Sequence, residues 1–361
     1  MHDDEVVTVR ASAPTRMCDN GGWTDTWFAE FGTVFSIAIE PRVHVEIVSR
    51  PRDGTRPSVI IEARSFGDRY VPDGIDSGRW GPHPLLEASI AEMEPSADSS
   101  LEITIESTAP HGASIGTSAA ACVALIGALD ALSPGRMTPA EVARAAWRVE
   151  TMRLGQQSGV QDQLAAAFGG INLIHIDRYP ETRVTRLDVA PAIASDLERR
   201  MVLVYLGAPH DSSAIHDEVI ADLSQAGRTA PRLAALRETA QQSADAVLAG
   251  DFEELGRIMT ANTEAQRRLH HGLVSPRADL LIAAAMRCGA LGYKVNGAGG
   301  DGGAITLLTD GEPDTVARTV DAVSSVGESC AVLPFRLAAD GLRVEIDDAA
   351  LGPTGAHDDP R

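Results

Sequence analysis

The sequence predicts an α+β fold in two domains. A length of 361 residues is long for one hydrophobic core and comfortable for two. Short β-rich runs and helices alternate in the first half, whereas residues 213–285 are predicted to be mostly helical before strands return. The clearest boundary falls within residues 188–198. We therefore expect an N-terminal domain over residues 1–190, a C-terminal domain over 199–346 and a mobile acidic tail over 347–361.

In the first domain, alternation and β-branched residues predict strands, and Pro41 favours a hairpin between the second and the third strand. The predicted strands cover residues 6–12, 33–39, 43–48, 58–63, 101–106 and 171–176. The predicted helices cover residues 84–93, the segment from a run of small residues to about residue 132, and 138–152. Thr138 can cap the last helix, because Pro139 suits its first turn and Glu141 stands three residues after Thr138.

The second domain begins with a predicted strand at residues 199–205 and continues with helices. Glycine, serine and proline interrupt the helical stretch at residues 250–251 and 274–276. The remaining predicted elements are a glycine-rich turn and strand within 292–309, a helix over 314–326, and closing strands at 330–337 and 342–345.

Composition excludes several classes of partner. The formal net charge of -20 argues against nucleic acid and against an anionic membrane surface, both of which call for basic residues. No stretch approaches about 18 uninterrupted apolar residues, so no membrane span is expected. The four cysteines are dispersed and form no CxxC pair, and Met1–Glu5 is short and acidic. We therefore expect a reduced, cytoplasmic protein.

Residues 108–132, TAPHGASIGTSAAACVALIGALDAL, place small residues directly ahead of an apolar helix. Two explanations remain open from these residues alone. Small side chains let two elements pack closely, and bare N–H groups at a helix N-terminus bind an anion such as phosphate. Gly112 and Gly116 would permit the positive φ that a phosphate loop needs. The run is not a Walker sequence, because it has no Gly-Lys-Ser/Thr.

Three further segments carry groups suited to chemistry. Glu150 and Asp162 could supply a Mg²⁺ ligand and a proton acceptor, although spacing alone favours a solvated helix residue for Glu150 and leaves a helix cap open for Asp162. Residues 14–25, PTRMCDNGGWTD, form either a polar pocket or a solvated surface loop. Residues 294–304, KVNGAGGDGGA, form a second glycine-rich turn, which is weak evidence by itself.

Together these segments resemble, in the same order, the motifs of the GHMP kinase superfamily, over about residues 9–345. The first motif is Ala13-Pro14-x-Arg16 followed by Gly21 and Thr24-Asp25. The second is Pro110-x-Gly112-x-Ser114-Ile115-Gly116-Thr117-Ser118-Ala119-Ala120. The third is Asn296-Gly297-Ala298-Gly299-Gly300-Asp301-Gly302-Gly303. The resemblance implies an N-terminal left-handed βαβ domain and a C-terminal ferredoxin-like domain.

The resemblance also implies the cofactors and the roles of residues. ATP phosphates would lie on Pro110, Gly112, Ala113, Ser114, Ile115, Gly116, Thr117, Ser118 and Ala119. Mg²⁺ would be held by Glu150 with Thr117 or Ser118, and the catalytic residues would be Asp162 and Arg16. The substrate would contact Asp19, Gly22, Trp23, Thr24, Asp25, Gly299, Gly300 and Asp301, with Trp23 either offering a ring face to a sugar or only packing.

Within the superfamily, residues 159–172, GVQDQLAAAFGGIN, resemble the branch of D-glycero-D-manno-heptose 7-phosphate kinases and related fucose kinases. Ser114 and Asp301 depart from this pattern, because both replace family glycines. The expected function is ATP-dependent phosphorylation of a hydroxyl on a sugar or sugar phosphate, with heptose 7-phosphate as one option. The alternatives are a kinase for an aminocyclitol or other non-sugar alcohol, or a ligand-binding member without catalysis. A homodimer is compatible with the resemblance.

Overall fold

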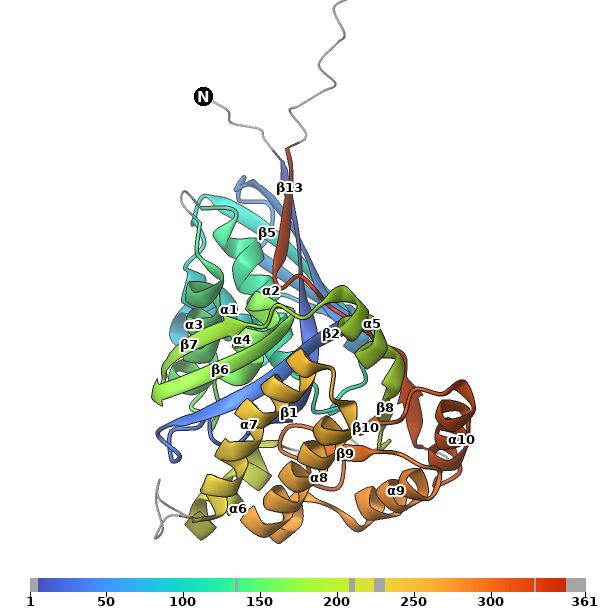
Figure 1. The fold of residues 1–361 in the computed structure, drawn as a ribbon. Helices are drawn as coiled ribbons and strands as arrows, with labels where there is room; N and C mark the ends of the chain where they lie inside the picture. The colour runs from blue at the N-terminus through green and yellow to red at the C-terminus, as the bar shows by residue number, and fades with distance from the viewer. Residues whose placement is uncertain (1–5, 134–135, 208–211, 224–230, 328, 349–361) are drawn as a thin grey trace, which may run out of the picture.

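The protein is seen in a computed structural model that describes residues 6–133, 136–207, 212–223, 231–327 and 329–348 (Figure 1). Two sheets organise the described residues, one of nine strands and one of four. Helices α1–α4 and α7 lie with the larger sheet, and α8–α10 lie with the smaller one (Figure 1). The predicted α+β fold with two domains is therefore confirmed.

The larger sheet has the strand order β13-β1-β2-β5-β3-β4. Its central strands are β1 (Val7–Asn20), β2 (Gly32–Pro51) and β5 (Ser99–Ser107), followed by β3 (Val59–Ala63) and β4 (Asp68–Tyr70). A second pair, β6 (Ile171–Arg178) and β7 (Glu181–Arg186), extends from the first half of β2. Strands β3 and β5 are parallel and are connected through α1 (Pro84–Met93), which makes a βαβ unit.

The predicted hairpin around Pro41 is wrong, because β2 is one continuous strand. Residues 32–37 of β2 pair with β6, and residues 43–51 pair with β5. Strand β1 follows β2 along both parts, with a shift in register between Pro14 and Thr15. Proline lacks an N–H group and is tolerated in a sheet at such irregularities. Pro41 therefore marks a change of pairing partner and not a reversal of the chain.

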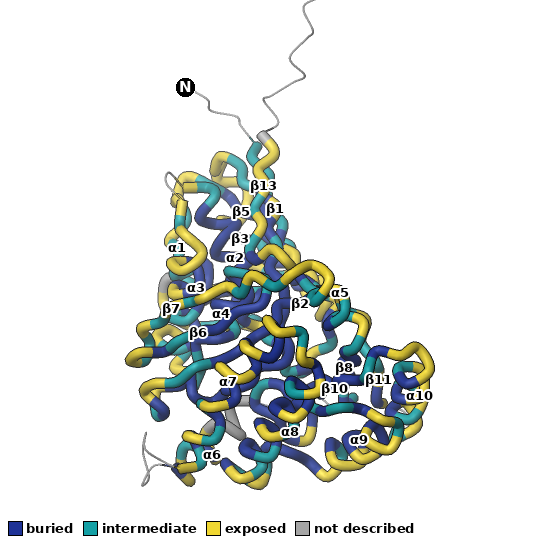
Figure 2. The backbone as a smooth tube through the Cα atoms, viewed as in Figure 1, coloured by how far each residue is buried: buried dark blue, intermediate teal, exposed yellow. Residues whose placement is uncertain are grey.

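Helix α2 (Thr117–Asp130) is buried along almost its whole length in the core of the first domain (Figure 2). Its small residues do serve close packing, since a Cβ on Gly127 would lie 2.6 Å from Leu342. Helix α3 (Pro139–Arg148) begins with the predicted capping box between Thr138 and Glu141. It continues into a π-helical turn over Val149–Arg153, and α4 (Gln161–Phe168) follows.

The smaller sheet consists of β8 (Met201–Tyr205), β9 (Gly292–Val295), β10 (Ala304–Leu308) and β11 (Ala331–Leu333). Its order is β11-β8-β10-β9 with antiparallel neighbours, which is the ferredoxin-like arrangement. Helix α5 (Pro191–Arg200) leads into this sheet. The remaining helices are α6 (Ser212–Leu223), α7 (Pro231–Ala249), α8 (Phe252–Leu269), α9 (Pro276–Arg287) and α10 (Pro313–Ser324).

The last described strands return to the first sheet. β12 (Arg336–Leu337) pairs with β2, and β13 (Arg343–Asp348) pairs with the first half of β1. Residues 336–348 therefore belong with the N-terminal domain, which differs from the boundaries expected from the sequence. The expected tail begins inside β13, and residues 349–361 lie outside the described part of the chain. Among the described helices, none has the length and apolar character needed to cross a membrane.

Candidate active site

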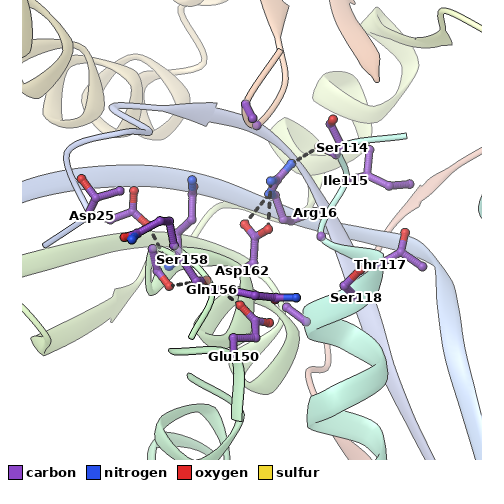
Figure 3. A pocket seen from close by; sticks show the side chains of 18 of the residues that line it. Arg16, Asp25, Ser114, Ile115, Thr117, Ser118, Glu150, Gln156, Ser158 and Asp162 are labelled. Carbon is purple, nitrogen blue, oxygen red and sulfur yellow. Dashed lines mark hydrogen bonds and ion pairs between the residues drawn. The ribbon is translucent and has the colours of Figure 1, made fainter. Parts of the chain in front are cut away.

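A cavity of about 480 Å³ lies at the N-terminus of α2, where segments of both domains meet (Figure 3). Its wall includes Gly297 and Ala298, which follow β9 in the second domain. The predicted site residues that line it are Arg16, Trp23, Asp25, Gly112, Ala113, Ser114, Ile115, Gly116, Thr117, Ser118, Ala119, Glu150 and Asp162. Pro110 is not part of the lining; its carbonyl accepts a hydrogen bond from the amide of Ala113 at 3.3 Å.

The loop before α2 has the backbone that an anion site needs. Gly112, Ser114 and Gly116 have φ values of 68°, 55° and 73°, all in the left-handed region. Ser114 therefore takes the conformation that favours glycine, which explains why the resembling motifs have glycine there. The first N–H groups of α2 have no acceptor within their own helix, and they begin at the cavity. The small residues thus serve both packing, deeper in α2, and an exposed helix N-terminus.

Arg16 and Asp162 form a two-pronged ion pair across the cavity wall (Figure 3). Nε of Arg16 donates to Oδ1 of Asp162 at 2.8 Å, and Nη2 donates to Oδ2 at 3.1 Å. Nη1 of Arg16 donates to the carbonyl of Ser114, so one guanidinium joins the loop before α2 to α4. Burial lowers the pKa of Arg16, but the carboxylates of Asp162 and Asp19 together raise it above its usual value.

Glu150 lies on the π-helical turn and faces the same cavity (Figure 3). Its side chain is buried, so the interpretation as a solvated helix residue is wrong. Oε2 accepts hydrogen bonds from Oγ of Ser158 and, at 2.8 Å, from Nε2 of Gln163. Burial raises the pKa of Glu150 to about 7, and the charge of Asp162 adds to the rise. A cation beside Glu150 would offset this cost and favour the ionised form.

Sequence reasoning missed Ser158 and Gln163, because nothing in their spacing marks them as partners of Glu150. The described residues contain no group of three His, Cys, Asp or Glu side chains that could hold a metal. A divalent cation at this place would therefore rely on Glu150, on hydroxyls and on oxygens of a bound ligand. That donor set suits Mg²⁺, which binds few carboxylates and usually keeps phosphate oxygens in its shell.

Asp19 is enclosed and does not line the cavity, and its contact with the substrate stays a prediction. Its carboxylate lies 3.1 Å from Nζ of Lys294, and both side chains are almost fully buried. The amide of Gly297 donates to both oxygens, at 3.1 and 3.0 Å. The ammonium of Lys294 and the guanidinium of Arg16 outweigh burial and hold the pKa of Asp19 below its usual range. Asp19 therefore ties β1 to β9.

Gly22 and Thr24 are also absent from the cavity lining. Oγ1 of Thr24 donates to the carbonyl of Gly21 at 2.7 Å. Trp23 and Asp25, in contrast, do line it, although both are nearly buried. The ring of Trp23 packs against Phe28 with centroids 6.4 Å apart, which supports the packing alternative.

The carboxylate that caps α4 belongs to Asp25 and not to Asp162. Oδ2 of Asp25 accepts the backbone N–H groups of Val160 and Gln161 at 2.9 and 3.1 Å. The hydrogen bonds given to the carboxylate of Asp162 come from Arg16. Burial raises the pKa of Asp25 to about 6, against the lowering effect of these amides. The helix-cap alternative for Asp162 is therefore not supported.

The third predicted motif contacts the cavity through its first part only. Gly299, Gly300 and Asp301 lie outside the lining, and Asp301 is exposed. Gly299 is needed for close packing, since a Cβ there would lie 2.0 Å from the carbonyl of Leu273. Gly300 bridges to Val274. The substrate contacts of these three residues stay predictions, and the packing of Gly299 and Gly300 on residues 273 and 274 is what the structure shows.

Comparison with known proteins matches both halves of the chain to one family. Residues 85–170 match the N-terminal domain of GHMP kinases, and residues 243–326 match their C-terminal domain. D-glycero-alpha-D-manno-heptose 7-phosphate kinase of Campylobacter jejuni is 23% identical over 299 residues, which cover 82% of this chain and 88% of that protein. Mevalonate kinase of Thermococcus gammatolerans is 28% identical over 255 residues, covering 68% and 69%.

Solved structures agree with this match at the level of the fold. A D-glycero-D-manno-heptose 1-phosphate kinase from Bacteroides thetaiotaomicron has a TM-score of 0.71 at 24% identity, covering 93% of this chain and 98% of that one. Galactokinase of Lactococcus lactis, solved with galactose, has a TM-score of 0.73 at 18% identity, covering 93% and 95%. With both domain matches in chain order and this fold around the cavity, the chain belongs to the GHMP kinase family.

Proposed function

We propose that this protein transfers the terminal phosphoryl group of ATP to a hydroxyl of a sugar or sugar phosphate. As a GHMP kinase, the chain is a phosphotransferase that uses ATP and an alcohol acceptor. The observation that carries the proposal is the Arg16–Asp162 ion pair, which faces the same cavity as the N-terminus of α2 and the carboxylate of Glu150. An anion site, a metal ligand and a proton acceptor are thus combined in one enclosure.

The N-terminus of α2 is assigned to the ATP phosphates. Its free N–H groups and the helix dipole both favour negative charge at this point. Glu150, with Thr117 or Ser118, would hold Mg²⁺, and the ion would neutralise phosphate charge as the phosphoryl group moves. Ser158 and Gln163 hold Oε2 of Glu150 and so keep the carboxylate fixed on the cavity wall.

Asp162 is assigned to the acceptor hydroxyl. A carboxylate within hydrogen-bond reach can orient the hydroxyl and take its proton as the oxygen attacks phosphorus. The side chain of Asp162 is 30% exposed, whereas that of its partner Arg16 is only 4% exposed. Arg16 therefore fixes the direction of the carboxylate from behind and leaves an open edge toward the cavity. The guanidinium also brings positive charge close to the site of phosphoryl transfer.

The cavity wall around Asp162 favours a neutral, hydroxyl-bearing acceptor. Gln156, Gln157 and Gln161 offer amides there, beside the carboxylate of Asp162 itself. Among the described lining residues, Arg16 is the one Lys or Arg side chain, and it is already bound to Asp162 and Ser114. A phosphate on the acceptor would need a cation beyond this wall. An aminocyclitol is the second candidate, because an ammonium group would suit the excess of carboxylates.

An assay of ADP release across a panel of acceptors tests the proposal. The panel should contain free hexoses, a free heptose, its 7-phosphate, mevalonate and an aminocyclitol, each with MgATP. We expect turnover with at least one sugar or sugar phosphate, and the wall chemistry favours a free sugar. Turnover of the aminocyclitol or mevalonate alone would replace the proposed substrate class. No turnover with any hydroxyl acceptor, with ATP still bound, would favour a ligand-binding protein without catalysis.

A substitution at Gly116 tests the assignment of the α2 N-terminus. Gly116→Val should weaken binding of MgATP at least about tenfold, roughly 1.4 kcal/mol. A Cβ at this position would lie 3.3 Å from Cγ of Arg16 and 3.4 Å from Cγ of Asp162, and the added methyl groups would enter the phosphate space. Calorimetric titration with a non-hydrolysable ATP analogue measures the change.

Gly54→Val is the matched control for this substitution. Gly54 has a φ of 74°, close to the 73° of Gly116, but a Cβ there would meet nothing within 4 Å. It therefore reproduces the backbone strain of a positive φ at a distance from the cavity. If folded Gly116→Val and Gly54→Val bind the nucleotide with equal affinity, the run of small residues before α2 serves packing alone.

A further inference from the structure

Asp25 is a cavity-wall residue whose carboxylate is almost wholly buried, with 1% of the residue exposed. It lies in the connection between β1 and β2, far in sequence from the helix that it contacts. Its Oδ2 accepts two backbone N–H groups, from Val160 at 2.9 Å and from Gln161 at 3.1 Å. These are the N-cap and the first residue of α4, and Asp162 is the next residue along the helix.

The backbone just before α4 packs closely against this carboxylate. A Cβ on Gly159 would lie 2.1 Å from Oδ2 of Asp25, so only glycine allows the approach. The β1–β2 connection contacts the segment before α4 at a second point, where Nε1 of Trp27 donates a hydrogen bond to Oε1 of Gln157. The β1–β2 connection therefore forms hydrogen bonds with the start of α4 at two places, both within a few residues of Asp162.

We propose that Asp25 is a positioning residue, which anchors the first turn of α4 and so places Asp162 against Arg16 and toward the acceptor hydroxyl. The inference rests on the role proposed for Asp162. Charge supports it, since a carboxylate at a helix N-terminus is stabilised both by the free N–H groups and by the helix dipole. Burial supports it too, because both acceptor bonds of Oδ2 are made inside the protein, where water cannot replace them.

Geometry explains why such an anchor would matter for rate. A displacement of about 1 Å between a catalytic group and its reacting partner can cost about 10²-fold in rate. The Arg16–Asp162 bonds hold the carboxylate end of Asp162, and the anchor at Asp25 holds its backbone. When the backbone hold is lost, α4 can shift at its first turn, and the two bonds to Arg16 cannot both keep their lengths of 2.8 and 3.1 Å.

Steady-state kinetics of Asp25→Ala and Asp25→Asn test the proposal. We expect Asp25→Ala to lower kcat about 10- to 100-fold while KM for the acceptor and for ATP stay within about twofold. Asparagine is also a good acceptor at a helix N-terminus, so Asp25→Asn should recover most of kcat. A rise in acceptor KM as the main effect of Asp25→Ala would overturn the inference and make Asp25 a substrate contact.

Amide hydrogen exchange of the segment around residues 157–164 gives a readout without activity. Asp25→Ala should remove protection at Val160 and Gln161, and Asp25→Asn should retain it. Unchanged protection in Asp25→Ala would overturn the inference whatever the kinetics show. Lost protection with undiminished kcat would overturn the positioning role alone. The catalytic role of Asp162 fails instead if Asp162→Asn keeps its kcat, so the two failures are distinguishable.

Two further variants complete the test, one as a substitute for Asp25→Ala and one as a control. Gly159→Ala forces a Cβ onto Oδ2 of Asp25 without changing the carboxylate, and it should also lower kcat. If Asp25→Ala does not fold, Gly159→Ala replaces it as the test, and full activity of Gly159→Ala would then contradict the inference. Asp251→Ala is the control, because Asp251 caps α8 through the amide of Glu254 at a distance from the cavity. It removes a comparable helix cap and should leave kcat unchanged.

Discussion

Asp162→Asn is expected to lower kcat by about 10²–10⁴-fold, which is the range for loss of a general base. Asparagine keeps nearly the same shape and can still accept a hydrogen bond from Arg16, but it cannot take a proton. Because the lost interaction belongs mainly to the transition state, KM for ATP should be nearly unchanged. Steady-state kinetics with saturating acceptor measure the effect, and melting curves confirm that the variant is folded.

Glu150→Gln is the contrasting variant in the same experiment. A metal ligand acts in the ground state as well as in the transition state, so its loss should raise the Mg²⁺ concentration needed for half-maximal rate. Asp162→Asn should leave that concentration nearly the same. A kcat near the wild-type value in Asp162→Asn would contradict the proposed mechanism. An unchanged Mg²⁺ requirement in Glu150→Gln would show that Glu150 is not a metal ligand.

Lys294→Met is expected to destabilise the protein by about 3–5 kcal/mol, because it removes the ammonium group that contacts the buried carboxylate of Asp19. The distance between Nζ and Oδ1 is 3.1 Å, and both side chains are at most 1% exposed. The amide of Gly297 continues to donate to Asp19, but it carries no full charge. Urea unfolding followed by fluorescence measures the change in the free energy of unfolding.

The double variant Asp19→Asn, Lys294→Met should recover part of this loss, since no buried charge is then left unpaired. The matched control is Arg257→Met, which breaks an exposed ion pair with Glu254 on α8. That pair has side chains 65% and 38% exposed and should contribute at most about 1 kcal/mol. Equal losses in Lys294→Met and Arg257→Met would contradict the assignment of Lys294 as a buried link between the domains.

Local signals in the sequence predicted local structure well. Helix α1 has the predicted bounds of Pro84–Met93, and the capping box of α3 forms between Thr138 and Glu141. Both signals depend on residues within one or two helical turns, so the local sequence contains them in full. The arrangement at Pro41 depends on which strands flank β2, and that information lies in residues 99–107 and 171–178. The sequence around Pro41 alone could not supply it.

The candidate site shows the same division. Arg16, Glu150 and Asp162 were expected from motif resemblance, and the structure brings them to one cavity. The role of Asp19 could not be predicted, because its partner Lys294 lies 275 residues later in a strand where lysine would ordinarily be exposed. A short polar motif such as residues 19–25 has the same sequence whether its carboxylates contact a ligand or form ion pairs and hydrogen bonds within the protein.

The return of β13 to β1 affects how the chain can assemble during its synthesis. β1 leaves the ribosome early, yet the partner for its outer edge, residues 343–348, follows only after both domains have been made. An unpaired strand edge is a template for other chains, so the nascent first domain stays prone to aggregation until that partner arrives. The first domain is therefore neither a separable segment nor complete until nearly the whole described chain has emerged.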